Sequence, residues 1–295
     1  MEPWQYLPPA LREAVTGLPA AVVEAIEEVR LRVGRPPVVY GAFGHRTLAL
    51  PPMTAAELQA LALGMAEHSW YAREDSLRQG FLTLPGGHRV GIAATAVVEA
   101  GRVVTVRDIS GLNLRRSRAL RGTAEPLVAR WGLHVPCSVL VAAPPRGGKT
   151  TLIRDLARIW SDGGAVTVVV DERGELAGTV DGCPQFDLGA HTDVLDGWPK
   201  AEGILAAIRA LGPEVVVVDE LGEEQEARAV ALAKRAGVAV VASLHLGHPQ
   251  ELEWSPGLAR LWRRGLFDVL VRLDPTRGPD RIASVERFRR PGGAP

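Results

Sequence analysis

This chain has few cysteines, and it shows neither a secretory leader pattern nor a long apolar run. It contains two cysteines among 295 residues, Cys137 and Cys183, and their separation fits no zinc-binding spacing. No secretory leader opens the sequence, and no apolar run approaches the ~20 residues that cross a bilayer. We therefore expect a protein of the reducing cytoplasm that does not insert into a membrane and is peripheral to one only through a partner.

Lysine is also rare, and the formal net charge is zero. Acidic and basic residues balance at 34 each, so nothing global favours nucleic acid or an anionic surface as a partner. The basic residues are almost all arginine, and the only lysines are Lys149, Lys200 and Lys234. Such a skew is typical of genome composition more than of a function. The length and the 46% apolar content suffice for a buried core and suggest two domains.

The clearest positive feature is a phosphate-binding loop. The apolar run 138–142 leads into Ala-Pro-Pro-Arg-Gly-Gly-Lys-Thr at 143–150, and a helical pattern follows, so that a helix N-terminus points at the anion. In such loops backbone N–H groups surround the phosphates, a lysine reaches the β- and γ-phosphates, and the next hydroxyl binds Mg²⁺. Lys149 and Thr150 fit the last two roles, although Ala143 replaces the first glycine of the motif; a structural glycine turn is the alternative. The candidate residues for binding the nucleotide are Pro144, Pro145, Arg146, Gly147, Gly148, Lys149, Thr150 and Thr151.

Beyond the loop, strands and helices alternate in the manner of a parallel sheet. We expect strands over 165–170, 214–218 and 238–242, helices over 200–211 and 223–236, and a hairpin of 267–273 against 281–288. Polar residues follow the carboxyl ends of these strands. In open parallel sheets that edge is where ligands bind.

An acidic pair, Asp219 and Glu220, follows a strand of four valines at that edge. There an aspartate can hold the Mg²⁺ of a nucleotide, and the neighbouring glutamate can orient or deprotonate water. The expected strand 165–170 separates this pair in sequence from the loop strand, as in the additional-strand class of P-loop ATPases that includes RecA. This arrangement favours a hydrolase over a small-molecule kinase. The alternative is an Asp-Glu pair that caps a turn.

Longer motifs resemble those of one family. The stretch 193–203, Asp-Val-Leu-Asp-Gly-Trp-Pro-Lys-Ala-Glu-Gly, together with 219–222, is similar to the stage III sporulation protein AA family, relatives of the type II and type IV secretion ATPases. The segments 28–36, 86–91 and 109–116 resemble further marks of that family. The expected fold class is therefore α/β, a RecA-like P-loop NTPase domain with a parallel-strand core at 123–295, preceded by a smaller α/β N-terminal domain at 1–122.

The resemblance implies an ATP hydrolase, dependent on Mg²⁺, in the mother-cell cytoplasm of spore-forming bacteria. Such an ATPase energises a secretion-like channel complex between mother cell and forespore, with membrane proteins of that complex as partners. The resemblance also implies a homo-oligomeric ring, a hexamer, with each nucleotide near a subunit boundary. Carried over to this sequence, Thr150 and Asp219 would bind the metal, and Glu220 would be the leading catalytic base. The stretch 171–175 resembles the acidic box of secretion ATPases, so Glu172 is a second candidate for positioning the water.

A histidine and several arginines complete the implied site. His245 resembles the histidine-box or sensor position; the alternative is a strand-end histidine bonded to backbone. A guanidinium aimed at the γ-phosphate can be supplied by a neighbouring subunit, and secretion ATPases use arginines of the N-terminal domain in this way. The leading candidates are Arg89 and Arg116, and Arg107 and Arg115 are further candidates. The alternative for each is a solvated surface residue.

The N-terminal domain carries no catalytic constellation of its own. Its expected elements are a helix over 9–15, a strand pair within 37–50, a helix over 54–69, and strands over 90–96 and 102–107. Thr54 and Glu57 are spaced as a capping box. Trp70 and Tyr71 are expected to pack between helix and sheet rather than to stack on nucleic acid. The arginine-rich stretch 115–118 is expected to act as a hinge.

Three function classes fit these observations. The first is the ring ATPase for export. The second is a RecA-like ATPase associated with nucleic acid through 115–121, which the zero net charge and the lack of stacking aromatics disfavour, so no nucleic-acid partner is expected. The third is a nucleotide-gated scaffold that binds ATP with little hydrolysis.

Overall fold

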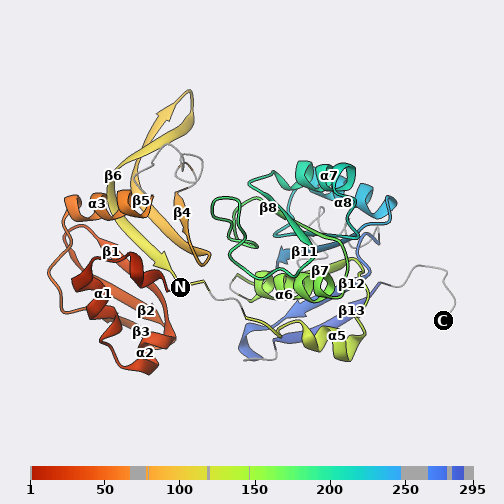
Figure 1. Ribbon diagram of the computed structural model, residues 1–295, viewed down its shortest axis with the longest axis horizontal. Coiled ribbons are helices and arrows are strands. Elements are labelled where there is room, and N and C mark those ends of the chain that lie inside the picture. The colour runs from red at the N-terminus through yellow and green to blue at the C-terminus, as the bar shows by residue number, and fades with distance from the viewer. Residues whose placement is uncertain are drawn as a thin grey trace. The chain divides into compact units, whose positions relative to one another are not determined.

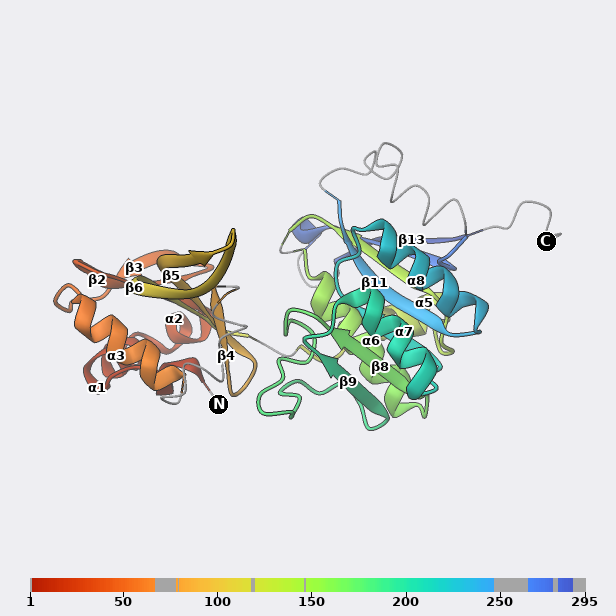
Figure 2. The same ribbon diagram turned by 90° about the horizontal axis from the view of Figure 1, so that it is seen from above.

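Two compact units make up the chain. The computed structural model describes residues 2–66, 78, 80–117, 120–145, 147–246, 265–277 and 281–288. Residues 1–118 with 178–185 form the first unit, and residues 119–177 with 186–295 form the second. Each unit has its own sheet (Figures 1 and 2). Each also has its own buried core.

Within the described residues, the first unit is a six-stranded antiparallel sheet in the order β3-β2-β1-β6-β5-β4. Its elements are η1 (Pro3–Tyr6), α1 (Pro9–Thr16), α2 (Ala20–Ala25), β1 (Ile26–Arg32), β2 (Arg35–Gly41), β3 (Gly44–Thr47), α3 (Ala55–Met65), β4 (Phe81–Leu84), β5 (His88–Glu99) and β6 (Arg102–Arg115). Alternate residues of β1, such as Val29 and Leu31, are fully buried in the core that also contains Leu58 of α3. Because side chains alternate along a strand, Arg30 and Arg32 lie on the opposite face of the sheet.

The helix α3 begins at the predicted capping box and ends earlier than predicted. The Thr54 hydroxyl accepts a hydrogen bond from the Glu57 N–H (3.2 Å), and the Glu57 carboxylate accepts one from the Thr54 N–H (2.7 Å). The helix ends at Met65 rather than at 69, close after Gly64, a residue of poor helix propensity. Trp70 and Tyr71 lie outside the described residues.

In the part of the chain that the structure describes, the second unit is a seven-stranded sheet in the order β13-β12-β7-β11-β10-β8-β9. Its elements are α5 (Glu125–Trp131), β7 (Val139–Ala143), α6 (Lys149–Asp162), β8 (Thr167–Asp171), β9 (Thr192–Asp196), α7 (Lys200–Ala210), β10 (Val215–Val218), α8 (Glu224–Arg235), β11 (Ala239–His245), β12 (Val269–Leu273), η3 (Pro275–Arg277) and β13 (Ile282–Arg287). The strands from β12 to β9 are parallel, and β13 joins antiparallel. The strands and helices predicted after the loop are confirmed, whereas α5 and β9 were not predicted.

The strand order separates the loop strand from the acidic strand. β11 lies between β7 and β10, and β8 lies on the far side of β10. The strand that stands between the two motifs in space, as the RecA-like class requires, is therefore β11, whereas β8 separates them only along the sequence. The carboxyl ends of β7, β11 and β10 are adjacent at one edge.

Helices cover both faces of this sheet (Figure 1). Val139 and Val141 of β7 are buried in the core that contains α5 and α6, whereas Leu140 and Ala142 are buried in the core that contains α7 and α8. Strands buried on both faces become continuous apolar runs, which is why they are readily recognised in the sequence. α7 packs closely on β8, because a Cβ at Gly203 would lie 2.4 Å from Cγ1 of Val170.

Candidate active site

The phosphate-binding loop connects β7 to α6. Gly148 is the N-cap of α6 with φ = +90°, a conformation that favours glycine. A Cβ at Gly147 would lie 2.6 Å from Cβ of Ala143, so this position also requires glycine. Ala143 is the last residue of β7, where extended backbone suits alanine, which explains why the first glycine of the motif is dispensable here. Arg146 lies outside the described residues, and Thr151 lies in the first turn of α6.

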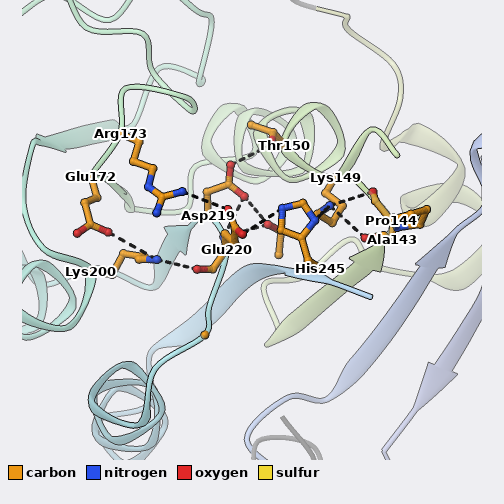
Figure 3. Close-up of polar contacts among 12 residues, drawn as sticks. Ala143, Pro144, Lys149, Thr150, Glu172, Arg173, Lys200, Asp219, Glu220 and His245 are labelled. Atoms are coloured by element: carbon orange, nitrogen blue, oxygen red, sulfur yellow. Dashed lines mark hydrogen bonds and ion pairs between the residues drawn. The ribbon is translucent and has the colours of Figure 1, made fainter. Parts of the chain in front are cut away.

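Lys149 begins α6 and is 6% exposed. Its Nζ donates hydrogen bonds to the carbonyl oxygens of Ala143 (3.1 Å) and Pro144 (3.2 Å) and contacts Nδ1 of His245 (2.9 Å; Figure 3). An ammonium group has three protons and cannot accept, so Nδ1 of His245 is the acceptor in this pair. Burial lowers the pKa of Lys149, and the nearby carboxylates of Asp219 and Glu220 oppose that shift.

His245 connects the loop lysine to the acidic pair. With Nδ1 accepting from Lys149, the neutral ring carries its proton on Nε2, which lies 3.1 Å from Oε1 of Glu220. The imidazole therefore bridges Lys149 and Glu220 at the end of β11. These are side-chain contacts, not the backbone contacts of the alternative interpretation.

Asp219 accepts hydrogen bonds from the neighbouring strand β11, from the residue that follows it and from the first turn of α6. Its Oδ2 accepts from the Thr150 hydroxyl (2.9 Å), and its Oδ1 accepts from the Ser243 hydroxyl and from the Glu220 N–H (2.9 Å). A threonine hydroxyl beside an aspartate carboxylate is an oxygen donor set of the kind that Mg²⁺ prefers. The residues present therefore fit a magnesium ion.

Glu220 has an unusual backbone conformation. Its φ is +42°, in the left-handed region that costs a non-glycine residue about 1–2 kcal/mol. Its N–H also lies 3.0 Å from Oγ of Ser243, and its carbonyl accepts from Nζ of Lys200 (2.6 Å). Its carboxylate is 39% exposed and lies between His245 and Arg173, whose Nη1 is 3.5 Å away. Such strain persists only where the surroundings hold it, and it is concentrated at functional sites.

The acidic stretch 171–175 divides into a structural and an accessible part. Asp171 is 2% exposed, and its carboxylate accepts from the N–H groups of Glu175 (2.8 Å), Leu176 (3.1 Å) and Ala177 (2.7 Å). Burial raises the pKa of Asp171, although these N–H groups oppose the shift. Glu172 extends to Lys200, with Oε2 3.5 Å from Nζ.

A small cavity of about 20 Å³ lies between the ends of β8 and β10. That volume holds about one water molecule. The cavity is lined by Val170, Asp171, Glu172, Arg173, Glu175, Lys200, Asp219 and Glu220.

The structure thus brings together the loop residues, the acidic pair, Glu172 and His245 in the second unit. Three further residues at the site were given no role from the sequence, namely Arg173, Lys200 and Ser243. Lys200 had one available signal, since it is one of three lysines in the chain. Ser243 had another, since it follows a predicted strand at the edge where ligands bind.

The candidate arginines belong to the first unit. The Arg89 guanidinium stacks on Phe81, 3.8 Å from the ring centroid. Arg116 is anchored within its own unit, because it donates to Oε1 of Glu2 (2.5 Å) and to the Glu24 carbonyl (2.9 Å). Nη1 of Arg107 lies 3.1 Å from Oδ2 of Asp108. Arg115 is the exposed last residue of β6.

The loop between β7 and α6, the contact of Thr150 with Asp219 and the intervening strand β11 define a RecA-like P-loop NTPase fold. Solved structures with a similar fold include the following two. The ATPase DotB of Legionella pneumophila is similar over 90% of this chain and 76% of that chain, with a TM-score of 0.56 and 15% identity. The pilus retraction motor PilT, in a structure with bound ADP, is similar over 86% and 77%, with a TM-score of 0.58 and 16% identity.

The sequence comparisons are more specific. The model of the family described as "Sporulation stage III, protein AA" matches residues 6–290. Stage III sporulation protein AA of Bacillus subtilis (strain 168) is 37% identical over 286 residues, which are 95% of this chain and 93% of that protein. The chain therefore belongs to the stage III sporulation protein AA family, as its motifs predicted.

Every helix in the described part of the chain is too short or too polar to span a bilayer.

Proposed function

We propose that this protein is an Mg²⁺-dependent ATPase that acts in sporulation. One observation carries the proposal: Lys149, Thr150, Asp219 and Glu220 meet at the edge formed by β7, β11 and β10, with His245 between the loop and the acidic pair. Membership of the sporulation family and the ATPase fold of DotB and PilT support it. ATP is the expected nucleotide.

Each residue has a chemical task in this proposal. Lys149 would exchange its carbonyl acceptors for β- and γ-phosphate oxygens, while the N–H groups of the glycine loop and the α6 N-terminus bind the remaining oxygens. Thr150 and Asp219 would hold Mg²⁺, the aspartate through water. When bound, the ion neutralises charge that develops on the phosphates.

Glu220 is the proposed base that orients or deprotonates the attacking water. Its carboxylate is accessible and is oriented by Nε2–H of His245 on one side and by Arg173 on the other. Glu172 is the second candidate for this role, but it lies beside the Lys200 ammonium. The contact of Glu220 with His245, which itself contacts the loop lysine, favours Glu220.

Thr150 offers a direct test of the metal site. We expect ATP to bind wild-type protein more tightly with Mg²⁺ than with EDTA, and Thr150→Ala to lose most of that difference because the hydroxyl ligand is gone. Thr150→Ser restores a hydroxyl at the same place and should restore the difference. Isothermal titration calorimetry measures all three proteins. A Thr150→Ala protein with the full magnesium dependence would contradict the assignment.

We further propose that the protein works as a homo-oligomeric ring, a hexamer, in which an arginine of the first unit completes the site of a neighbouring subunit. Arg89 is the leading candidate and Arg116 the second, because Arg116 already binds Glu2 and backbone within its own unit. The ring would lie in the mother-cell cytoplasm, at the membrane through protein partners of a sporulation channel. Hydrolysis there would drive channel assembly or transport. The proposed boundary between the two domains is 122/123, near the hinge.

Mixed rings test the arginine. Arg89→Ala and Glu220→Gln proteins are each expected to lose turnover, because each lacks one half of every site. When the two proteins are mixed, some interfaces combine an intact Glu220 with an intact Arg89 from the neighbour, so phosphate release should recover. Mixtures that stay inactive, although mass photometry shows mixed rings, would place the arginine in its own subunit's site or outside the mechanism.

A further inference from the structure

Lys200 occupies a position between the acidic elements of the site (Figure 3). It is the first residue of α7, and its side chain is 12% exposed. Its Nζ lies 2.6 Å from the carbonyl oxygen of Glu220, 2.9 Å from Oε1 of Glu226 and 3.5 Å from Oε2 of Glu172. These acceptors come from the ends of β10 and β8 and from the first turn of α8. One ammonium group therefore connects three elements.

The contact with the Glu220 carbonyl acts on a strained residue. Glu220 has φ = +42°, and its N–H is held by Asp219 and Ser243. Lys200 holds the other end of the same residue. Donors and acceptors on both sides are what keeps a non-glycine residue in this conformation.

Glu226 connects Lys200 to the backbone of the residues that follow Glu220. Its Oε1 contacts Lys200, and its Oε2 accepts from the N–H groups of Gly222 (2.7 Å) and Glu223 (2.9 Å). The carboxylate is 7% exposed, so this pair is largely shielded from water. Lys200 and Glu226 together determine the path of the backbone from 220 to 223.

The arrangement of the acceptors explains why a lysine stands at position 200 in a chain whose basic residues are almost all arginine. Only three of its 34 basic residues are lysines. An ammonium is a compact charge with three donors that can converge on three acceptors, whereas a guanidinium is a planar fork that suits paired, coplanar acceptors. At 200 the acceptors are one carbonyl and two carboxylates from three different elements, which a fork cannot match.

We propose that Lys200 is a positioning residue that keeps Glu220 in its left-handed conformation and so directs the Glu220 carboxylate toward His245 and the nucleotide edge. This inference rests on the proposed ATPase function. Lys200 acts through Glu220 and does not contact the nucleotide. Its loss therefore affects turnover rather than binding.

Two substitutions test the role. Lys200→Met keeps the apolar stem and removes the donors, and Lys200→Arg keeps the charge. We expect both to lower kcat for ATP by about 100-fold, the scale of a misplaced catalytic group, with KM unchanged. Lys234→Met is the matched control: it removes a lysine held by Asp268 (2.8 Å) and the Leu266 carbonyl (3.3 Å), and kcat should be retained. A Lys200→Arg protein with wild-type kcat would overturn the proposal that an ammonium group at this position is what holds Glu220 in place.

A double-mutant cycle identifies the partner. If Lys200 acts through Glu220, then Lys200→Met should lower turnover no further in a protein that already carries Glu220→Gln. An additional loss of the same size as in wild type would mean that Lys200 acts elsewhere.

A measurement without nucleotide separates this inference from the proposed function. Hydrogen exchange of the Glu220, Gly222 and Glu223 amides should be faster in Lys200→Met and Lys200→Arg than in wild type, while exchange in the interior of α6 should be unchanged. Should the wild type fail to hydrolyse ATP, the proposed function fails and this exchange still decides the role of Lys200. Should Lys200→Met not fold, Lys200→Arg gives the same readout. Unchanged exchange at these amides would overturn the inference.

Discussion

Glu220→Gln is expected to lower the ATP turnover number by about 10²–10⁴-fold, the contribution of a general base, while ATP binding is retained. Glutamine keeps the size of the side chain and can still accept from Nε2–H of His245, but it cannot take a proton from water. Quenched-flow measurement of phosphate release gives turnover, and a fluorescent ATP analogue gives binding.

The neighbouring Glu172 supplies the control for this prediction. Glu172→Gln removes another carboxylate that lines the same small cavity and weakens one contact of Lys200. We expect a much smaller loss than for Glu220→Gln. The reverse ranking would exchange the roles of the two glutamates.

Lys149→Ala is expected to lower kcat/KM for ATP by about 10²–10³-fold, because it removes a cationic donor that would stabilise charge on the phosphates. Binding should weaken together with turnover, which distinguishes Lys149 from Glu220. Titration with the same fluorescent ATP analogue measures binding.

Stability provides the control for Lys149→Ala. The ammonium is nearly buried, and burial lowers its pKa, so the folded protein gains little from keeping the charge. We expect the melting temperature without nucleotide to be close to that of wild type. A protein that melts normally and still binds ATP as tightly as wild type would show that the loop does not hold phosphate through this lysine.

Much of the second unit was predictable, because its strands are buried on both faces. Val215–Val218 is an uninterrupted apolar strand, and the acidic pair after it marks the ligand edge. The glycine loop was recognisable because its backbone requires glycine: Gly148 needs a positive φ, and Gly147 has no room for a Cβ. In these places the local residue choice agrees with the tertiary structure.

The remaining features depend on contacts between distant residues. β9 is an edge strand of mixed, partly exposed residues and includes Asp193 and Asp196, so it has neither an apolar run nor a regular alternation. The left-handed conformation of Glu220 has no local signal, because its partners Ser243 and Lys200 lie about twenty positions away in each direction. Asp171 was grouped with the acidic box from its neighbours, whereas its burial against three backbone N–H groups gives it a structural task.

The most direct test of ATP hydrolysis is steady-state phosphate release by wild-type protein, with MgATP and with ATP plus EDTA, while light scattering reports the oligomeric state of the same samples. The proposed mechanism predicts release that requires Mg²⁺ and that rises with the fraction of protein in rings. Assembled rings that bind MgATP and release no phosphate would contradict the proposed ATP hydrolysis. They would identify the protein as a nucleotide-gated scaffold.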